Sequence, residues 1–400
     1  MKPIRWIKNT MPRTADARLP IMAPSEVTKA KAFHQTIPGY APTPLVQLPR
    51  MAEHLGLSGI FVKDESARFG LNAFKVLGGS FAMAKYIAGK TARDIADLDF
   101  AALTSRQLRE AIGQVTFFTA TDGNHGRGVA WAAHRLGQKA VVFMPKGSTP
   151  TRLANILAEH AAATIQDANY DECVRMAAAA AAGTEHGVVI QDTAWEGYEE
   201  IPSWIMQGYG TMAAEASRQL AAFGVPRPTH IFLQAGVGSM AGAVQGYFAN
   251  KYPQAPPIVV VVEADTAACL YQGALRGDGR EAVVAGDMPT IMAGLACGEP
   301  NPISWDILKN HTSHFAAAPD WAAAKGMRML AAPLPGDSQI VSGESGAVTF
   351  GLLAELMTNP DYSDFKESIG LDQRSTILLF STEGDTDPER YQKIVWGGEQ

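Results

Sequence analysis

Short apolar runs recur along the chain, and longer segments with helical spacing separate them. Each run is rich in β-branched or aromatic residues, which is typical of strands. The runs that predict strands are residues 60–63, 115–119, 140–144, 188–191, 231–234, 258–263 and 376–380. Strands that are apolar throughout and alternate with helices form parallel sheets covered on both faces. The pattern therefore predicts an α/β fold of two lobes, with mainly parallel sheets flanked by helices.

Two other segments lie outside this pattern of strands and helices. The alanine-rich segment 176–182 has low complexity, but alanine is the best helix former, so it predicts an ordinary helix. Residues 1–20 carry five basic residues and no continuous apolar stretch, so we expect an arm and not a secretory signal. No apolar run reaches the roughly 18 residues of a membrane span. No membrane partner is therefore expected.

Length and composition limit the class of protein. The 400 residues are 46% hydrophobic and 18% charged, which gives a large core and exceeds one ordinary domain, so two lobes are expected. A net charge of -6 without a basic cluster argues against a nucleic-acid partner. Cys173, Cys269 and Cys297 lack metal-ligand spacing, which favours a reducing cytoplasm over a disulfide framework. A bridge between Cys269 and Cys297 stays open, because bridging depends on distances.

Lys75 lies in the run 72–77, Asn-Ala-Phe-Lys-Val-Leu. Its apolar neighbours favour the neutral amine, because burial penalises the charged form. A lysine amine that loses its proton near neutral pH can attach covalently to a carbonyl cofactor. Most lysines are solvated, and we expect this of Lys63 and Lys85. The setting of Lys75 instead favours a catalytic role.

A glycine-rich loop, residues 236–240, follows the predicted strand 231–234 and precedes a helical segment. Glycines let backbone amides crowd an anion, and a helix N-terminus adds a favourable dipole, so the loop predicts a phosphate site. The same loop matches a dinucleotide fingerprint, with Glu263 near the place of the ribose-binding acid. A nicotinamide (NAD) dehydrogenase is therefore one alternative. A plain turn between a strand and a helix is another.

Two more polar blocks follow strands: residues 121–126, Thr-Asp-Gly-Asn-His-Gly, and residues 381–385, Ser-Thr-Glu-Gly-Asp. Glycines that flank an amide let a loop approach a planar ring closely. In their order and spacing, the lysine block, the glycine loop and these two blocks resemble the fold type II pyridoxal phosphate (PLP) enzymes. That group includes threonine dehydratase, serine racemase and cysteine synthase.

The resemblance implies PLP as cofactor, attached at Lys75. It places Asn124 beside the ring hydroxyl of PLP, while His125 is interpreted as structural. A hydroxyl is implied against the pyridine nitrogen, for which Thr382 is the first candidate and Ser381 the alternative. A hydroxyl cannot hold the ring protonated as a carboxylate would, which favours elimination over transamination.

The resemblance also implies how the phosphate is held and how the chain is divided. The residues expected at the phosphate are Gly236, Val237, Gly238, Ser239 and Met240; Val237 and Ser239 depart from the tetraglycine loop of the group. The expected lobes are residues 1–80 plus 203–400, which bind PLP, and a small lobe of residues 81–202.

Two acids carry the prediction of the substrate. Most dehydratases of the group have serine where this chain has Asp122. A carboxylate there can take the α proton or attract a cation on the β carbon, so we expect a substrate with a second amine. A free aspartate titrates near 3.9, so an efficient base needs a raised pKa. Helix capping is the alternative for Asp122. Asp192 also follows a strand, and two carboxylates on opposite faces could deprotonate either enantiomer.

With the segments 292–300 and 342–346, the chain is similar to the diaminopropionate ammonia-lyases over residues 39–396. This resemblance implies PLP-dependent α,β-elimination of D- and L-2,3-diaminopropionate to pyruvate and two ammonia. It assigns the D form to Asp122 and the L form to Asp192, and it implies a homodimer. The alternatives are a serine or threonine dehydratase of the same fold and a non-catalytic protein that binds PLP or an amino acid.

Overall fold

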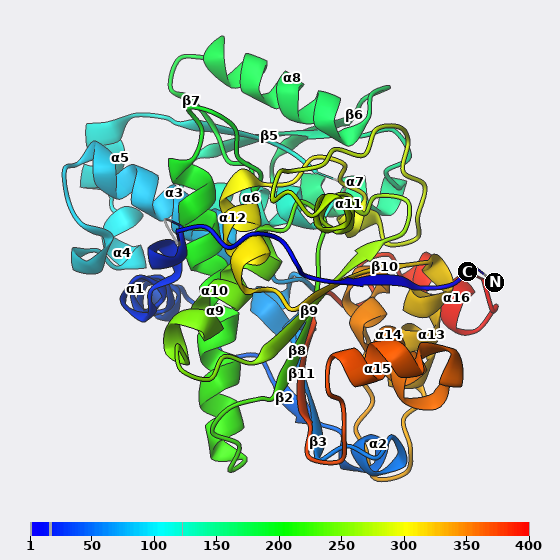
Figure 1. The fold of residues 1–400 in the computed structure, drawn as a ribbon. Helices are drawn as coiled ribbons and strands as arrows, with labels where there is room; N and C mark the ends of the chain where they lie inside the picture. Colours follow the sequence, from blue (N-terminus) through cyan, green and yellow to red (C-terminus); the bar gives the residue numbers. More distant parts are fainter. Residues whose placement is uncertain (1, 16–17, 122, 400) are drawn as a thin grey trace.

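Helices pack on both faces of two β-sheets in the computed structural model, which describes residues 2–15, 18–121 and 123–399 (Figure 1). The predicted α/β class is confirmed. The larger sheet has seven strands in the order β1-β10-β9-β8-β11-β3-β2. Its neighbours are parallel except at the two edges, where β1 and β2 run antiparallel to β10 and β3. The strands are β1 (Arg5–Lys8), β2 (Leu45–Gln47), β3 (Gly59–Asp64), β8 (His230–Gln234), β9 (Ile258–Ala264), β10 (His314–Ala318) and β11 (Thr376–Ser381).

The smaller sheet has four parallel strands in the order β6-β5-β4-β7. Its strands all lie within residues 81–202, the range predicted for the small lobe. They are β4 (Thr116–Ala120), β5 (Lys139–Met144), β6 (Ala162–Ile165) and β7 (Gly187–Val189).

The seven predicted strands correspond to β3, β4, β5, β7, β8, β9 and β11. Strands β1, β2, β6 and β10 were not predicted. Strand β1 falls in the segment expected to be an arm, and that expectation is wrong for residues 5–8, which pair with β10. The helix predicted at 176–182 is confirmed as the second half of α8.

The helices connect successive strands and cover both sheet faces (Figure 1). No described helix is both long enough and apolar enough to cross a bilayer. The α-helices are α1 (Pro24–Thr36), α2 (Pro49–His54), α3 (Val76–Lys90), α4 (Phe100–Leu103), α5 (Arg106–Ile112), α6 (Asn124–Arg135), α7 (Pro150–Leu157), α8 (Tyr170–Ala182), α9 (Glu200–Ala222), α10 (Ser239–Lys251), α11 (Cys269–Arg276), α12 (Pro302–His311), α13 (Asp320–Ala331), α14 (Glu344–Thr358), α15 (Ser363–Ser368) and α16 (Pro388–Val395). Short 3-10 turns are η1 (Leu19–Met22), η2 (Glu65–Gly70), η3 (Ile95–Asp97), η4 (Ala293–Leu295) and η5 (Pro360–Tyr362).

Alternate residues of the central strands enter two separate cores. In β8, Ile231 and Leu233 join the core under α1, α3, α9 and α10, whereas Phe232 joins the core under α13 and α14. Side chains of a strand point alternately to its two faces, so both faces must be apolar for both cores to form. This explains why the central strands have continuous apolar sequences.

A buried ion network fixes the chain just before Lys75. Lys63 Nζ lies 2.7 Å and Arg68 Nη2 lies 2.8 Å from Glu215 Oε2, and Arg68 also pairs with Glu65 at 2.9 Å. All four side chains are buried, and two positive charges balance two negative ones. The expectation that Lys63 is solvated is wrong, because its partner lies on α9, far away in sequence. Lys85 is partly buried. Segment η2 is thereby anchored to α9.

Candidate active site

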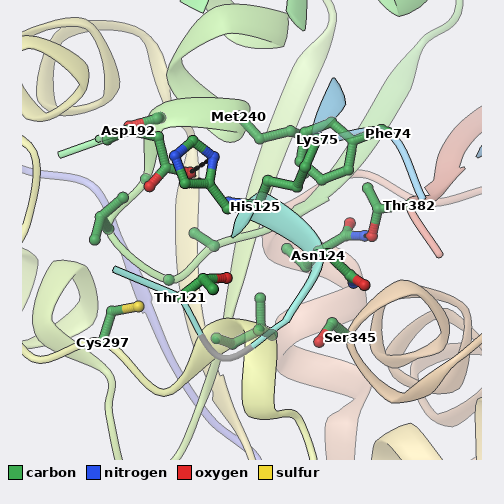
Figure 2. Close-up of a pocket in the computed structure, with 18 of the residues that line it drawn as sticks. Phe74, Lys75, Thr121, Asn124, His125, Asp192, Met240, Cys297, Ser345 and Thr382 are labelled. Carbon is green, nitrogen blue, oxygen red and sulfur yellow. Dashed lines mark hydrogen bonds and ion pairs between the residues drawn. The ribbon is translucent and has the colours of Figure 1, made fainter. Parts of the chain in front are cut away.

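The polar blocks meet at one cavity at the carboxyl ends of strands from both sheets (Figure 2). Parallel strands end at the same edge of a sheet, which is where ligands bind in open α/β folds. The lining residues are Phe74, Lys75, Ala120, Thr121, Asn124, His125, Tyr170, Asp192, Gln234, Ala235, Gly236, Val237, Gly238, Ser239, Met240, Gly294, Leu295, Cys297, Ser345, Thr382 and Glu383.

The lysine block is held against the block that follows β11. The amide of Phe74 donates to the carbonyl of Thr382 at 3.1 Å, and the amide of Gly384 donates to the carbonyl of Asn72 at 3.0 Å. A Cβ atom at Gly384 would lie 2.2 Å from Asn72 Oδ1, so only glycine allows this approach. Two segments far apart in sequence are therefore in register, and Lys75 directly precedes α3.

Lys75 forms an ion pair with Asp192 inside the cavity. Its Nζ donates to Asp192 Oδ2, which also accepts from Tyr209 Oη at 3.2 Å. The Lys75 side chain is 21% exposed, and that of Asp192 is 3% exposed. Phe74 and Tyr209 flank the amine, with ring centres 5.5 and 5.9 Å from Nζ. Sequence reasoning placed both Lys75 and Asp192 at the site but did not identify Tyr209.

The pKa of Asp192 is set by opposing effects. Burial acts to raise this pKa, but the charge of Lys75 opposes burial most strongly. With the contributions of His125 and the Tyr209 hydrogen bond, the pKa of Asp192 lies well below its usual range. Burial, followed by the Asp192 charge, raises the pKa of Tyr209 well above its usual range, so Tyr209 stays a donor. Asp192 is consequently ionised at neutral pH.

His125 is held against the segment that follows β7. Its Nε2 donates to the carbonyl of Ile190 at 2.9 Å, and its Nδ1 lies 4.0 Å from Asp192 Oδ2. The ring is buried. These contacts agree with a structural role, and they add an electrostatic influence on Asp192 that the sequence did not suggest.

Asn301 links Asp192 to the glycine loop. The Ser239 hydroxyl donates to the carbonyl of Asp192, and Asn301 Nδ2 donates to Ser239 Oγ at 2.8 Å and to the same carbonyl at 3.2 Å. The Asn301 amide donates to Val237 O at 2.8 Å. The Asn301 side chain also caps α12, so it both begins this helix and holds the glycine loop against Asp192. Nothing in the sequence around Asn301 indicated this second role.

The glycine loop leads from β8 into the N-terminus of α10. Gly238 precedes the helix with φ +95°, a left-handed conformation that favours glycine. A Cβ atom at Gly236 would lie 3.1 Å from Cys297 Sγ, and one at Gly238 would lie 2.9 Å from Ser304 Oγ. Residues 236–240 therefore line the cavity at the start of a 13-residue helix, where free backbone amides and the helix dipole can bind an anion.

The block after β11 places Thr382 at the cavity. Gln234 Nε2 donates to Thr382 Oγ1 at 2.8 Å. Ser381 is not among the lining residues, and its hydroxyl donates to Ser342 Oγ at 2.8 Å. The geometry favours Thr382 over Ser381 as the hydroxyl that faces a ligand.

Asn124 begins α6 and donates from Nδ2 to Glu383 Oε2. The other carboxylate oxygen of Glu383 accepts from the amide of Ser345 at 3.1 Å. Ser345 Oγ is buried at the cavity and has no hydrogen-bond partner among the described residues. Sequence reasoning identified Asn124 but not Glu383 or Ser345. Asp122 lies outside the described residues, and its role stays a prediction.

Comparison with known proteins identifies the family. Residues 36–364 match the family model described as pyridoxal-phosphate dependent enzyme. The diaminopropionate ammonia-lyase of Salmonella typhimurium is 57% identical, over 92% of this chain and 91% of that protein. This chain belongs to the diaminopropionate ammonia-lyase family. The crystal structure of the Escherichia coli enzyme in complex with D-serine is 46% identical, with a TM-score of 0.92 and coverage of 99% of this chain and 98% of that chain.

A second structure of the Escherichia coli diaminopropionate ammonia-lyase contains an aminoacrylate-PLP azomethine reaction intermediate. It is also 46% identical, with a TM-score of 0.90 and coverage of 99% of this chain and 98% of that chain. The expected cofactor, PLP, is confirmed by family membership.

The site of this chain fits PLP. A lysine amine, a glycine-rich loop at a helix N-terminus and a hydroxyl directly after β11 line one cavity; they belong to Lys75, residues 236–240 and Thr382. The Ser345 hydroxyl, which has no partner in the described part of the chain, is a further polar atom that a ligand would satisfy. The donor set matches an aldehyde, a phosphate and a pyridine ring.

The NAD dehydrogenase alternative is wrong for this lyase. Glu263 is buried, and its carboxylate accepts from the amides of Leu270 and Tyr271 at 2.8 and 2.6 Å. Burial raises the pKa of Glu263 to about 8, although these hydrogen bonds oppose it. The Glu263 side chain therefore holds the start of α11 inside the core, and it is not available to bind a ribose.

The cysteine bridge that the sequence left open is not formed in the lyase structure. Cys173, Cys269 and Cys297 are free and buried. The thiol of Cys269 lies 3.7 Å from the carbonyl oxygen of Cys297. Burial raises the pKa of the Cys269 thiol well above its usual range, with Glu263 adding to it. Cys269 is therefore protonated at neutral pH.

Gly238→Ala is expected to weaken PLP binding about tenfold or more, since the left-handed backbone and the close Ser304 contact cost roughly 1–2 kcal/mol. Gly224→Ala is a matched control, because Gly224 has φ +76° with open space around it. Both variants should lose stability in urea unfolding of the apoprotein, and Gly238→Ala should lose more because of the Ser304 contact. Only Gly238→Ala should bind PLP more weakly in a fluorescence titration, and equal PLP affinity for both variants would contradict a phosphate site at this loop.

Proposed function

We propose that this chain is a PLP-dependent carbon-nitrogen lyase that converts both D- and L-2,3-diaminopropionate to pyruvate and two ammonia. The observation that carries the proposal is the Lys75–Asp192 ion pair in one cavity with the glycine loop and Thr382. The relatives bearing the name diaminopropionate ammonia-lyase support the same activity.

Each part of PLP has residues suited to hold it. Lys75 is the covalent attachment point, and the backbone amides of 236–240 bind the phosphate with the α10 dipole. Thr382 forms a hydrogen bond with the pyridine nitrogen. Asn124, which Glu383 holds in place, forms a hydrogen bond with the ring hydroxyl. When bound, PLP withdraws electrons from the α carbon of an attached amino acid, which makes the α proton acidic.

Asp192 acts as the base for the L enantiomer. Its Oδ2 already accepts hydrogen bonds from Lys75 and Tyr209, so this oxygen lies beside the amine that lines the cavity. When Lys75 is neutral, the strongest influence that lowers the pKa of Asp192 disappears, and burial raises this pKa toward the working range of a base. The ion pair keeps Asp192 ionised while Lys75 carries a free ammonium.

Lys75 supplies a proton when it returns to its charged form. The β amine of the substrate leaves as ammonia only if its nitrogen is protonated, and the Lys75 ammonium at this position can donate that proton. Asp122, which follows the cavity residue Thr121 in sequence, is proposed as the base for the D enantiomer. Two bases on opposite faces give one enzyme access to both enantiomers.

Substrate choice is tested by assaying ammonia and pyruvate from D- and L-diaminopropionate beside serine and threonine. We expect kcat/KM to be at least about 10²-fold higher for diaminopropionate, because the carboxylates accommodate a second amine. A preference for serine or threonine would support the dehydratase alternative. Absence of any product from a PLP-loaded protein would support the non-catalytic alternative.

Assembly, location and lobes complete the proposal. A homodimer in the cytoplasm is proposed from the family resemblance and the free cysteines. Lobes of residues 1–80 plus 203–400 and 81–202 are proposed because the two sheets divide along the same lines. Light scattering of the holoenzyme, with twice the mass of 42.7 kDa expected, tests the dimer.

A further inference from the structure

Gln234 is a buried polar residue whose role the proposed mechanism does not use. It is the last residue of β8, is 2% exposed and lines the cavity. Strand β8 pairs with β11, so Gln234 lies beside the block that contains Thr382. Its Nε2 donates to the carbonyl of Phe380 at 2.9 Å and to Thr382 Oγ1 at 2.8 Å. Both amide hydrogens of Gln234 are therefore used.

Chemistry fixes the orientation of the Gln234 amide. The carbonyl of Phe380 can only accept hydrogen bonds, so the group facing it must be the donor NH₂ and not the oxygen of Gln234. Turning the amide over would place two acceptors against each other in a buried site, which is costly. The direction of the second hydrogen bond, from Gln234 to Thr382, follows from the first.

This direction determines what Thr382 can do. A hydroxyl has one hydrogen to donate, and its oxygen accepts from Gln234. No described residue accepts a hydrogen bond from Thr382, which lines the cavity. The hydroxyl hydrogen is therefore left for a ligand in the cavity. Thr382 is arranged as a donor.

A glutamine at position 234 would lower stability if its only role were to pack in the core. Its Oε1 is buried without a hydrogen-bond partner among the described residues. Leucine has a similar volume and would leave no polar atom unsatisfied, so a purely structural role would favour it. The cost indicates that the NH₂ group is needed.

We propose that Gln234 is a positioning residue that makes Thr382 donate its hydrogen to the pyridine nitrogen of PLP, so that this nitrogen is held unprotonated. The inference rests on the proposed function, because it requires PLP at Lys75. An unprotonated ring accepts less of the negative charge that develops at the α carbon. Gln234 thereby limits charge storage in the ring and favours loss of the β amine over competing reactions.

The test measures the nitrogen resonance of ring-¹⁵N-labelled PLP in the holoenzyme by NMR. Wild type should show an unprotonated pyridine nitrogen. Gln234→Glu replaces the donor by a carboxyl that accepts from Thr382, so the Thr382 oxygen turns toward the ring and the resonance should shift toward pyridinium. Gln234→Leu is the size control: Thr382 is no longer held as a donor but no new acceptor faces it, so the resonance should shift less than in Gln234→Glu.

A double variant shows whether Gln234 acts through Thr382. Thr382→Val removes the hydroxyl, so adding Gln234→Glu to it should produce no further shift. The inference is overturned by a protonated ring in wild type, by an unchanged resonance in Gln234→Glu, by equal shifts in the Glu and Leu variants, or by a full additional shift in the Thr382→Val background. Borohydride reduction and peptide mass analysis for PLP at Lys75 come first. Their failure would instead reject the proposed function.

Discussion

Lys75→Ala is expected to lower turnover of diaminopropionate by roughly 10⁴-fold or more, because both covalent attachment and proton transfer at Nζ are lost. The visible absorbance of the protein-bound cofactor should disappear as well. Ammonia and pyruvate release give the rate, and the absorption spectrum before and after borohydride gives the state of PLP. The variant should still fold, since Lys75 is partly exposed.

Lys85→Ala is the matched control for this variant. Lys85 lies on the same helix α3, is also partly buried and contacts Gln207, but it does not line the cavity. It should retain both colour and turnover. An active, colourless Lys75→Ala protein would contradict a role for PLP at this position, and equal losses in both variants would point to damage of α3.

The sequence was most informative where structure depends on local pattern. Strands β8 and β9 were predicted within a residue or two because both of their faces are buried, which leaves continuous apolar sequences. Strand β10, His-Phe-Ala-Ala-Ala, was missed because alanine has a low preference for strands and nothing local marks its burial between β1 and β9. Edge strands β1 and β2 are short and depend on partners distant in sequence.

The same distinction applies to the site. Lys75, Asp192 and Thr382 lie in blocks whose composition suggests chemistry, and the structure brings all three to one cavity. Tyr209 and Asn301 were missed because each occupies a position that looks like ordinary helix sequence. Their roles arise from tertiary contacts with Asp192, and a single sequence contains no signal for such contacts.

Asp192→Asn is expected to lower kcat for L-diaminopropionate by about 10²- to 10⁴-fold, the range typical of a lost general base. The amide oxygen of asparagine can still accept from Lys75 and Tyr209, so the site should keep its shape while losing the proton acceptor. The D enantiomer should be affected far less, since its proton is assigned to Asp122.

Asp122→Asn should give the opposite result, with turnover of the D form lost and that of the L form retained. The comparison uses the ratio of kcat for the two enantiomers within each variant, so a general loss of active protein cancels. Tyr209→Phe adds a matched control, because it removes one hydrogen bond to Asp192 and keeps the carboxylate. We expect it to lower the L rate by only about 2- to 12-fold. Equal losses of both enantiomers in Asp192→Asn would exclude a separate base for each, because Asp192 would then serve a step that both enantiomers share.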